Sequence, residues 1–303
     1  MSDTILEIKN LSKYFGKTKV VDNLSFEVKK GEILGFLGPN GAGKTTTIKM
    51  ILGMLSIDEG SISINGFDVK KNFEKAMENI GGIVENPDLY GYMSAVDNLK
   101  LHAKIRKVNY SEVYRVLELV NLSKSMNVKV SKYSLGMKQR AGLALSLLHS
   151  PKILILDEPT NGLDPVGIKD LRDILKKLTK EQGMSVLVSS HILSEMELMC
   201  DRVVMINNGK LIKEQALNDE NVIQSSVVEY EIKVKQTDDA IGILKDCGKE
   251  VKTIEDKIVV VIKKDEISEL IKTLVMKNID ILSVYEVEKT LENIFFDVTK
   301  GGK

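Results

Sequence analysis

Residues 33–46, ILGFLGPNGAGKTT, decide the fold of this chain. The apolar run 33–37 predicts a buried strand, and the pattern of residues 44–55 predicts a helix. The loop between them, residues 38–45, matches the pattern GxxxxGK[ST] in full and has the strand-to-helix context that the pattern requires. In such a loop, backbone N–H groups at a helix N-terminus surround phosphate oxygens, because the helix dipole favours anions there. The sequence therefore predicts a site for nucleotide phosphates.

This loop supplies most of the predicted nucleotide contacts. We expect Lys44 to reach the β- and γ-phosphates and Thr45 to offer its hydroxyl to Mg²⁺. The other nucleotide-binding residues predicted here are Gly38, Pro39, Asn40, Gly41, Ala42, Gly43 and Thr46.

A second apolar strand, residues 153–156, ends in two carboxylates. Asp157 is predicted to be a metal ligand, because the strand that accompanies a phosphate loop commonly ends in an aspartate that holds Mg²⁺. Glu158 would lie beside the γ-phosphate, where a carboxylate can orient or deprotonate the attacking water as a general base.

Length and charge narrow the class of protein. The chain has 303 residues, with 43 Lys or Arg and 43 Asp or Glu, so its formal net charge is zero. At about 150 residues per domain, this length indicates two domains. A zero net charge argues against a nucleic-acid partner. No uncharged apolar run approaches the roughly 20 residues that cross a bilayer, and the acidic start is unlike a signal peptide. We therefore expect a cytoplasmic chain that does not itself span a membrane.

Strands and helices alternate through residues 1–216. This alternation predicts an α/β fold with a mostly parallel sheet, an antiparallel β part and a helical insert at about residues 86–148. Residues 217–226 form the predicted linker. Beyond it, strands with alternating polar and apolar residues follow the order βαββαβ, which predicts a small α+β accessory domain at residues 227–303. A closing amphipathic helix is predicted to carry Leu291, Ile294, Phe295 and Val298.

With these motifs in order, residues 3–216 resemble the nucleotide-binding subunits of ABC transporters, a family built on a P-loop ATPase core. Residues 133–140, YSLGMKQR, stand where the family has its LSGGQ signature, and residues 161–164, NGLD, resemble its D-loop. The resemblance implies that Ser134 and Gly136 contact ATP held by an opposite subunit, and that His191 hydrogen-bonds the γ-phosphate. Leu135 departs from the family pattern, in which a glycine allows close backbone approach.

The resemblance extends to two further positions. Phe15 falls where the family places an aromatic ring that stacks on adenine, with Tyr14 as the alternative. Glu85 stands where the family usually has a glutamine that contacts Mg²⁺ and the attacking water, and it would bring a negative charge there. Glu85 is therefore a candidate for both catalysis and metal binding, beside Glu158 and His191.

The family implies an ATPase subunit that uses ATP and Mg²⁺ and powers a separately encoded transmembrane permease. It also implies a head-to-tail pair with an identical chain or a paralogue, held at the inner face of the membrane by the permease. Glu85 and the signature resemble the subfamily that exports bacitracin or lantibiotic peptides, which predicts export of an antimicrobial peptide or drug. The alternatives are a soluble ABC-type ATPase acting on ribosomes or DNA, and a nucleotide switch that scarcely hydrolyses ATP.

Overall fold

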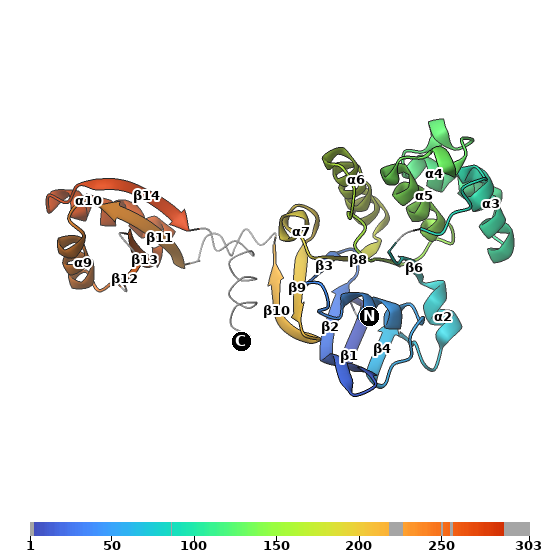
Figure 1. The fold of residues 1–303 in the computed structure, drawn as a ribbon, viewed down its shortest axis with the longest axis horizontal. Coiled ribbons are helices and arrows are strands. Elements are labelled where there is room, and N and C mark those ends of the chain that lie inside the picture. The colour runs from blue at the N-terminus through green and yellow to red at the C-terminus, as the bar shows by residue number, and fades with distance from the viewer. Residues whose placement is uncertain (1–2, 86, 218–226, 250, 255–256, 288–303) are drawn as a thin grey trace. The chain divides into compact units, whose positions relative to one another are not determined.

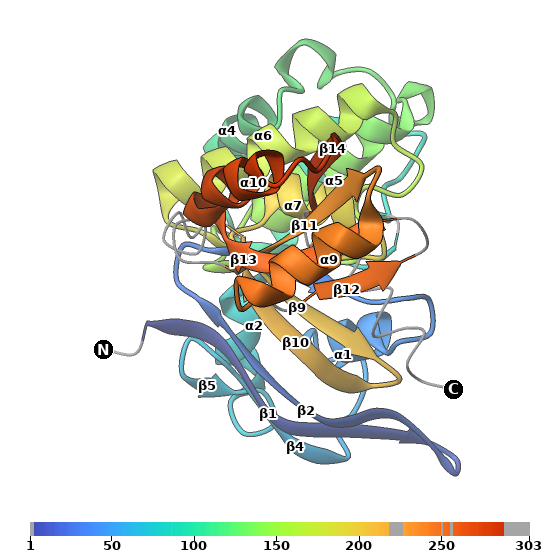
Figure 2. The same cartoon turned by 90° about the vertical axis from the view of Figure 1, so that its left-hand side faces the viewer.

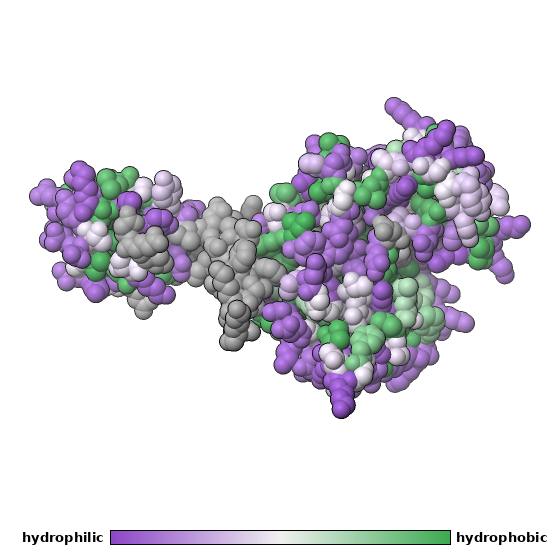
Figure 3. Space-filling view, in the orientation of Figure 1, coloured by the Kyte–Doolittle hydropathy of each residue, from purple (hydrophilic) through white to green (hydrophobic). Residues whose placement is uncertain are grey.

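The computed structural model describes residues 3–85, 87–217, 227–249, 251–254 and 257–287. It divides into two compact units, residues 1–217 and 218–303, and each has a hydrophobic core of its own. Within these described ranges, no helix combines the length and the apolar character that a bilayer crossing needs. Polar residues cover most of the visible surface of the larger unit, and hydrophobic residues form small separate groups (Figure 3).

An antiparallel sheet opens the larger unit, and its strands lie side by side as one layer in Figure 2. The strand order is β2-β1-β4-β5, with β1 at Thr4–Phe15, β2 at Thr18–Lys29, β4 at Glu59–Ile64 and β5 at Phe67–Asp68. Alternate side chains such as Leu6, Ile8, Ile62 and Ile64 are buried. One face of this sheet therefore packs on the core.

The second sheet positions the candidate site. Its order is β10-β9-β3-β8-β7-β6, with β3 at Ile33–Leu37, β6 at Ile80–Ile83, β7 at Ile153–Leu156, β8 at Ser185–Ser190, β9 at Arg202–Asn207 and β10 at Lys210–Ala216. Neighbouring strands from β9 to β6 are parallel, and β10 is antiparallel to β9. Every residue of β3, β7 and β8 is buried. The carboxyl ends of these three parallel strands meet at one edge, where ligands of such sheets bind.

Two groups of helices complete the larger unit. Close to the sheets lie α1 (Lys44–Ile51), α2 (Phe73–Glu78), α6 (Pro165–Gln182) and α7 (Leu193–Met199). The insert comprises α3 (Ala95–Arg106), α4 (Tyr110–Leu119) and α5 (Leu135–Leu147), which gather at the β6 end of the unit (Figure 1). Helix α1 ends four residues before the predicted end, because the chain turns at Gly53 with φ +69°.

Contacts between β2 and the second sheet join the two sheets. The ring of Phe26 stacks on that of Phe36, with 5.1 Å between centroids. Arg202 donates to the carbonyl of Glu27 (2.7 Å) and to the carboxylate of Glu32 (2.8 Å). The antiparallel layer and the parallel sheet therefore share one core, as the predicted fold class requires.

The smaller unit follows the predicted α+β order. Its elements are β11 (Val227–Val234), α9 (Thr237–Asp246), β12 (Val251–Ile254), β13 (Lys257–Lys263), α10 (Ile267–Met276) and β14 (Ile281–Val287). The sheet order is β12-β13-β11-β14, with all neighbours antiparallel. The closing helix predicted around Leu291 to Val298 lies outside the described residues.

Candidate functional site

A cavity of about 240 Å³ opens where the glycine-rich loop meets α1. It is lined by Val20, Asn40, Gly41, Gly43, Lys44, Thr45, Thr46, Glu158 and Asn161. Gly43 caps the N-terminus of α1 with φ +102°, and a Cβ there would lie 2.9 Å from the carbonyl oxygen of Val20. Any other residue would be strained and would clash with the neighbouring strand. The loop thus brings backbone N–H groups and the start of a helix to one cavity, which is the arrangement that holds phosphates.

Lys44 is the cation of this cavity, and its side chain is only 5% exposed. Its ammonium donates to the carbonyls of Gly38 (2.7 Å) and Pro39 (3.2 Å) and lies 3.1 Å from Oε1 of Glu158. A buried charge needs such partners, because burial without them is costly. The structure therefore brings together the lysine of the loop and the second carboxylate that follows strand β7.

His191 lies on the other side of the same carboxylate. Its Nδ1 is 2.8 Å from Oε2 of Glu158, so the two carboxylate oxygens face Lys44 and His191 separately. Glu158 itself is in the left-handed region with φ +49°, two residues after the end of β7. Its backbone N–H donates to the Ser189 hydroxyl at 2.9 Å. A carboxylate oriented in this way on a phosphate cavity has the placement of a general base.

Asp157 is 1% exposed, and one of its oxygens, Oδ1, accepts a hydrogen bond from Ser189 at 2.7 Å. Its second oxygen, Oδ2, is buried and has no hydrogen-bond partner among the described residues. An unpaired buried carboxylate oxygen fits a hard divalent cation, for which oxygen ligands are preferred. Thr45, the other predicted ligand, lines the cavity.

Ser189 and Val20 belong to the site although the sequence reasoning missed them, and Asn161 of the segment that resembles the D-loop lines the cavity as well. Ser189 joins Asp157 to the backbone of Glu158, and the other two line the cavity. Ser189 had a detectable pattern, because it lies near the end of a buried strand beside β7, where parallel strands bring their carboxyl ends together. Val20 had none, since it lies on a strand of the other sheet.

The segment that resembles the signature does not line this cavity. Ser134 caps α5 by accepting a hydrogen bond from the Met137 N–H at 3.3 Å. Leu135 lies against Gly162, which has φ +74°. A Cβ added at position 162 would be 3.0 Å from the Cδ2 atom of Leu135. Gly136, in contrast, has room for a Cβ, since its nearest neighbouring atoms would be 3.8 and 3.9 Å away. Packing within the chain therefore does not explain the glycine at 136.

The two aromatic candidates are held differently. Tyr14 donates to Glu59 at 3.3 Å, and the Lys19 ammonium lies 5.3 Å from its ring centroid. Phe15 is 50% exposed and has the Lys13 ammonium 5.7 Å from its ring centroid. The exposed ring of Phe15 is thus the freer of the two to receive a flat ligand.

Glu85 is not among the residues that line the phosphate cavity. It takes φ +60° after β6, is 68% exposed, and lies 3.5 Å from the ammonium of Lys49 on α1. The structure therefore places Glu85 beside the helix of the loop, where its carboxylate pairs with Lys49.

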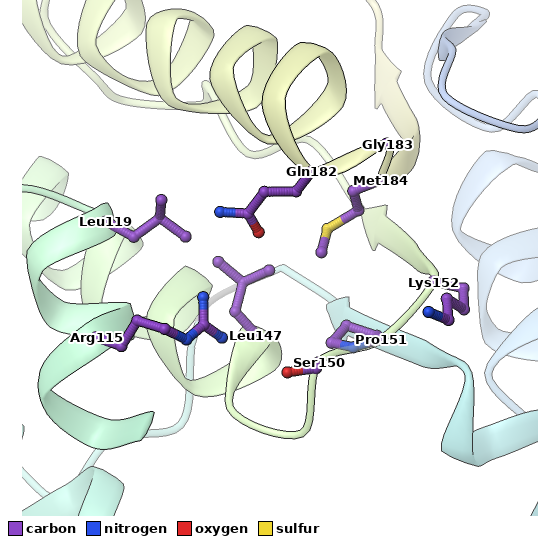
Figure 4. A pocket seen from close by; sticks show the side chains of 9 residues that line it. All are labelled: Arg115, Leu119, Leu147, Ser150, Pro151, Lys152, Gln182, Gly183 and Met184. Atoms are coloured by element: carbon purple, nitrogen blue, oxygen red, sulfur yellow. The ribbon is translucent and has the colours of Figure 1, made fainter. Parts of the chain in front are cut away.

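A separate cavity of about 180 Å³ lies near the ends of α4, α5 and α6 (Figure 4). Its nine lining residues are Arg115, Leu119, Leu147, Ser150, Pro151, Lys152, Gln182, Gly183 and Met184, none of which is a predicted site residue. Arg115 is paired with Glu112 at 2.6 Å. This cavity is unrelated to the phosphate loop.

Comparisons with known proteins identify the family of this chain. A family model described as ABC transporter matches residues 21–161. The uncharacterized ABC transporter ATP-binding protein YhcH of Bacillus subtilis (strain 168) is 47% identical over 98% of this chain and 96% of its own length. The bacitracin transport ATP-binding protein BcrA of Bacillus licheniformis is 39% identical over 99% of this chain and 98% of its own length.

A solved structure, that of an ATP binding subunit of an ABC transporter, shares the fold. The TM-score is 0.64 and the sequence identity is 34%. The match covers 71% of this chain and 91% of the solved chain. The fold class and the family expected from the sequence are confirmed. This chain belongs to the ATP-binding subunits of ABC transporters, which bind ATP and hydrolyse it to power transport.

Proposed function

We propose that Glu158 is the general base of ATP hydrolysis in this subunit. The observation that carries this proposal is the position of its carboxylate between Lys44 and His191 at the mouth of the phosphate cavity. Glu158 takes a proton from the water that attacks the γ-phosphorus as the bond to the ADP oxygen breaks. Lys44 donates to the phosphate oxygens, and His191 keeps the carboxylate oriented and reaches the γ-phosphate.

The residues present fit a magnesium ion. Asp157, with its unpaired oxygen, and the hydroxyl of Thr45 would hold the ion. When bound, Mg²⁺ neutralises charge on the phosphates during transfer. Ser189 fixes the Asp157 carboxylate through one oxygen and so leaves the other free for the ion. Glu85 is a further proposed ligand, and it would have to leave Lys49 to serve.

The general base is tested by the turnover of Glu158→Gln, which keeps the size of the side chain and removes its basicity. We expect a loss of at least about a hundredfold in kcat, since a positioned base contributes roughly 10²–10⁴-fold. The matched control is Glu181→Gln, on the exposed end of α6, which should leave turnover unchanged. Equal rates for Glu158→Gln and the control would exclude Glu158 as the base.

We also propose that two copies pair head to tail, with Ser134 and Gly136 of one chain on the ATP held by the other. Three features support this pairing. Ser134 and Gly136 stand at the N-terminus of α5, where N–H groups favour anions. They lie outside the cavity of their own chain, and packing within the chain does not require the glycine at 136.

A permease is proposed to dock where the helical insert meets the core. A cavity of about 530 Å³ there is lined by residues of β6, α3 and α5, and by Met54 and Phe73. The side chains of Met54 and Phe73 are 61% and 48% exposed, and exposed apolar groups beside a cavity are typical of a protein interface. Glu85 lies two residues after the end of β6 and pairs with Lys49 on α1, so a movement of the insert would reach the helix of the phosphate loop.

The proposed cargo is an antimicrobial peptide or drug of the bacitracin or lantibiotic type. The support is the full-length similarity to a bacitracin transport protein. Purification of the chain from its native cells in mild detergent should recover a polytopic membrane protein in stoichiometric amount. Loss of the gene should lower resistance to bacitracin, and Glu158→Gln should not restore it. Ribosomal or DNA-bound partners would instead indicate the soluble class of ABC ATPase, which the transporter relatives do not favour.

A further inference from the structure

Lys13 is an almost buried cation at the end of β1, two residues before Phe15. Its side chain is 8% exposed, and its ammonium donates to the carboxylate of Asp58 (2.9 Å) and the hydroxyl of Ser56 (3.0 Å). The other oxygen of Asp58 accepts from the backbone N–H of Tyr14 at 2.8 Å. A single carboxylate therefore fixes the side chain at 13 and the backbone at 14.

This pair is a strong local constraint because its cation is removed from water. A buried ammonium that loses its partner is far more costly than an exposed one. The pKa of Asp58 is lowered, first by the hydrogen bond from the Tyr14 backbone and then by Lys13, so the carboxylate is charged at neutral pH. The constraint ties the last residues of β1 to the loop before β4, more than forty residues away in sequence.

The pair of Lys13 and Asp58 constrains the position of the exposed aromatic ring of Phe15. The ammonium of Lys13 lies 5.7 Å from the centroid of Phe15, within the range of a cation–π interaction. Lys13 also pairs across the hairpin with Val21, whose neighbour Val20 lines the phosphate cavity. The hairpin that carries Phe15 therefore rests on the start of α1, beside the phosphate loop.

We propose that Lys13 and Asp58 are positioning residues for ATP, holding Phe15 as the surface on which the adenine ring stacks. Lys13 occupies one face of the ring, and the base uses the other. This inference depends on the proposed function, in which Phe15 is the adenine contact. The pair contributes to the binding of the base and not to the binding of the phosphates.

The test separates the base from the phosphates. Binding of MgATP and of inorganic tripolyphosphate with Mg²⁺, which has no base, is measured by calorimetry on the full chain. Lys13→Met and Asp58→Asn should each weaken ATP binding by about tenfold, the scale of stacking between a base and an aromatic ring. Both should leave tripolyphosphate binding unchanged, which also shows that the loop is folded. Lys13→Arg, which keeps the cation, should lose less than Lys13→Met.

Lys17→Met is the matched control, because Lys17 is exposed on the same hairpin, and it should bind both ligands normally. If Lys13→Met weakens the binding of ATP and of tripolyphosphate equally, the pair of Lys13 and Asp58 is merely structural and the inference is wrong. Unchanged ATP binding in Lys13→Met overturns it as well. Phe15→Ala distinguishes the adenine contact of Phe15 from the positioning role of Lys13. If Phe15→Ala weakens ATP binding while Lys13→Met does not, only the positioning role fails. If Phe15→Ala has no effect, the adenine contact itself fails.

Discussion

At the residue scale, the arrangement of the two carboxylates after β7 follows from one strained position. Glu158 has φ +49°, a conformation that costs a residue with a side chain about 1–3 kcal/mol and that recurs at functional sites. The Ser189 hydroxyl holds both the Asp157 carboxylate and the Glu158 N–H. The turn therefore sends the first carboxylate into the protein and the second to Lys44 and His191.

Glu85 and Lys49 give a prediction at the same scale. If Glu85 serves the metal, Lys49 competes with the ion for its carboxylate. Glu85→Gln should then raise the Mg²⁺ concentration for half-maximal turnover, and Lys49→Met should lower it. Each shift should be about two- to threefold, because exposed pairs contribute only about 0.2–1 kcal/mol. The measurement is an Mg²⁺ titration of ATPase rate for the three proteins at low salt. Three superimposable titrations would exclude Glu85 as a ligand.

The predicted site residues that line one cavity come from contiguous motifs. They are Glu158 and six residues of the phosphate loop region, namely Asn40, Gly41, Gly43, Lys44, Thr45 and Thr46. They are recognisable because a pattern of several residues lies at the end of a buried strand. Lys13 and Asp58 have no such pattern. Their partnership depends on the pairing of β1 with β2 and β4, and nothing in the spacing of 45 residues predicts it.

At the element scale, the two strands of the first hairpin show where periodicity fails. The alternating pattern predicts short strands at residues 5–9 and 24–28, whereas β1 and β2 have twelve residues each. The pairing shifts register between Ile8 and Leu11, and Asn10 and Asn23 take positive φ there. A bulge breaks the period of two, so the pattern ends although the strand continues.

Two serine N-caps allow the structural and functional contributions of α5 to be separated. Ser134 caps α5 and Ser94 caps α3, each by accepting an N–H three residues on, at 3.3 and 3.2 Å. Replacing either serine with alanine should cost about 1 kcal/mol of stability, measured by thermal unfolding. Only Ser134→Ala should also lower kcat, by about tenfold or more, because a hydrogen bond to a charged phosphate is lost as well.

Ser94→Ala is the control, because it removes a cap from the same insert without touching the proposed ATP contact. Equal ATPase rates for the two variants would reduce Ser134 to a helix cap. A loss of rate in both would indicate that the insert must be rigid for turnover, and it would remove the support for a direct contact.

At the scale of the whole molecule, the change in strand character beyond the linker at residues 217–226 reflects two separate cores. Strands β3, β7 and β8 of the larger unit are buried on both faces, whereas β11 buries alternate residues, namely Tyr230, Ile232 and Val234. This contrast in burial is readable as a contrast between continuous and alternating apolar runs. Pairing between copies is not readable in this way, because the apolar pattern of a strand reflects burial within its own chain.

Gly136 connects the folding of one chain to the pairing of two. A Cβ at 136 would meet its neighbours at 3.8 and 3.9 Å, which is ordinary contact, so Gly136→Ala should fold normally. Its stability should be unchanged or higher, by up to about 1 kcal/mol, since alanine favours helices over glycine. Against a partner's ATP, however, the added methyl prevents close approach of the backbone. In a Glu158→Gln background that retains ATP, sedimentation velocity should show a dimer when the glycine is kept and a monomer when Gly136→Ala is added.

Gly242→Ala provides the comparison, because Gly242 lies inside α9 with no heavy atom within 4 Å of an added Cβ. It makes the same chemical change in a helix with the same expected gain in stability, but away from the proposed interface. Normal ATP-dependent dimers in Gly242→Ala and none in Gly136→Ala would mean that the glycine is required by the partner and not by the chain. Dimers in both would contradict a close contact between Gly136 and the partner's ATP, because the added methyl would then meet no obstacle at the interface.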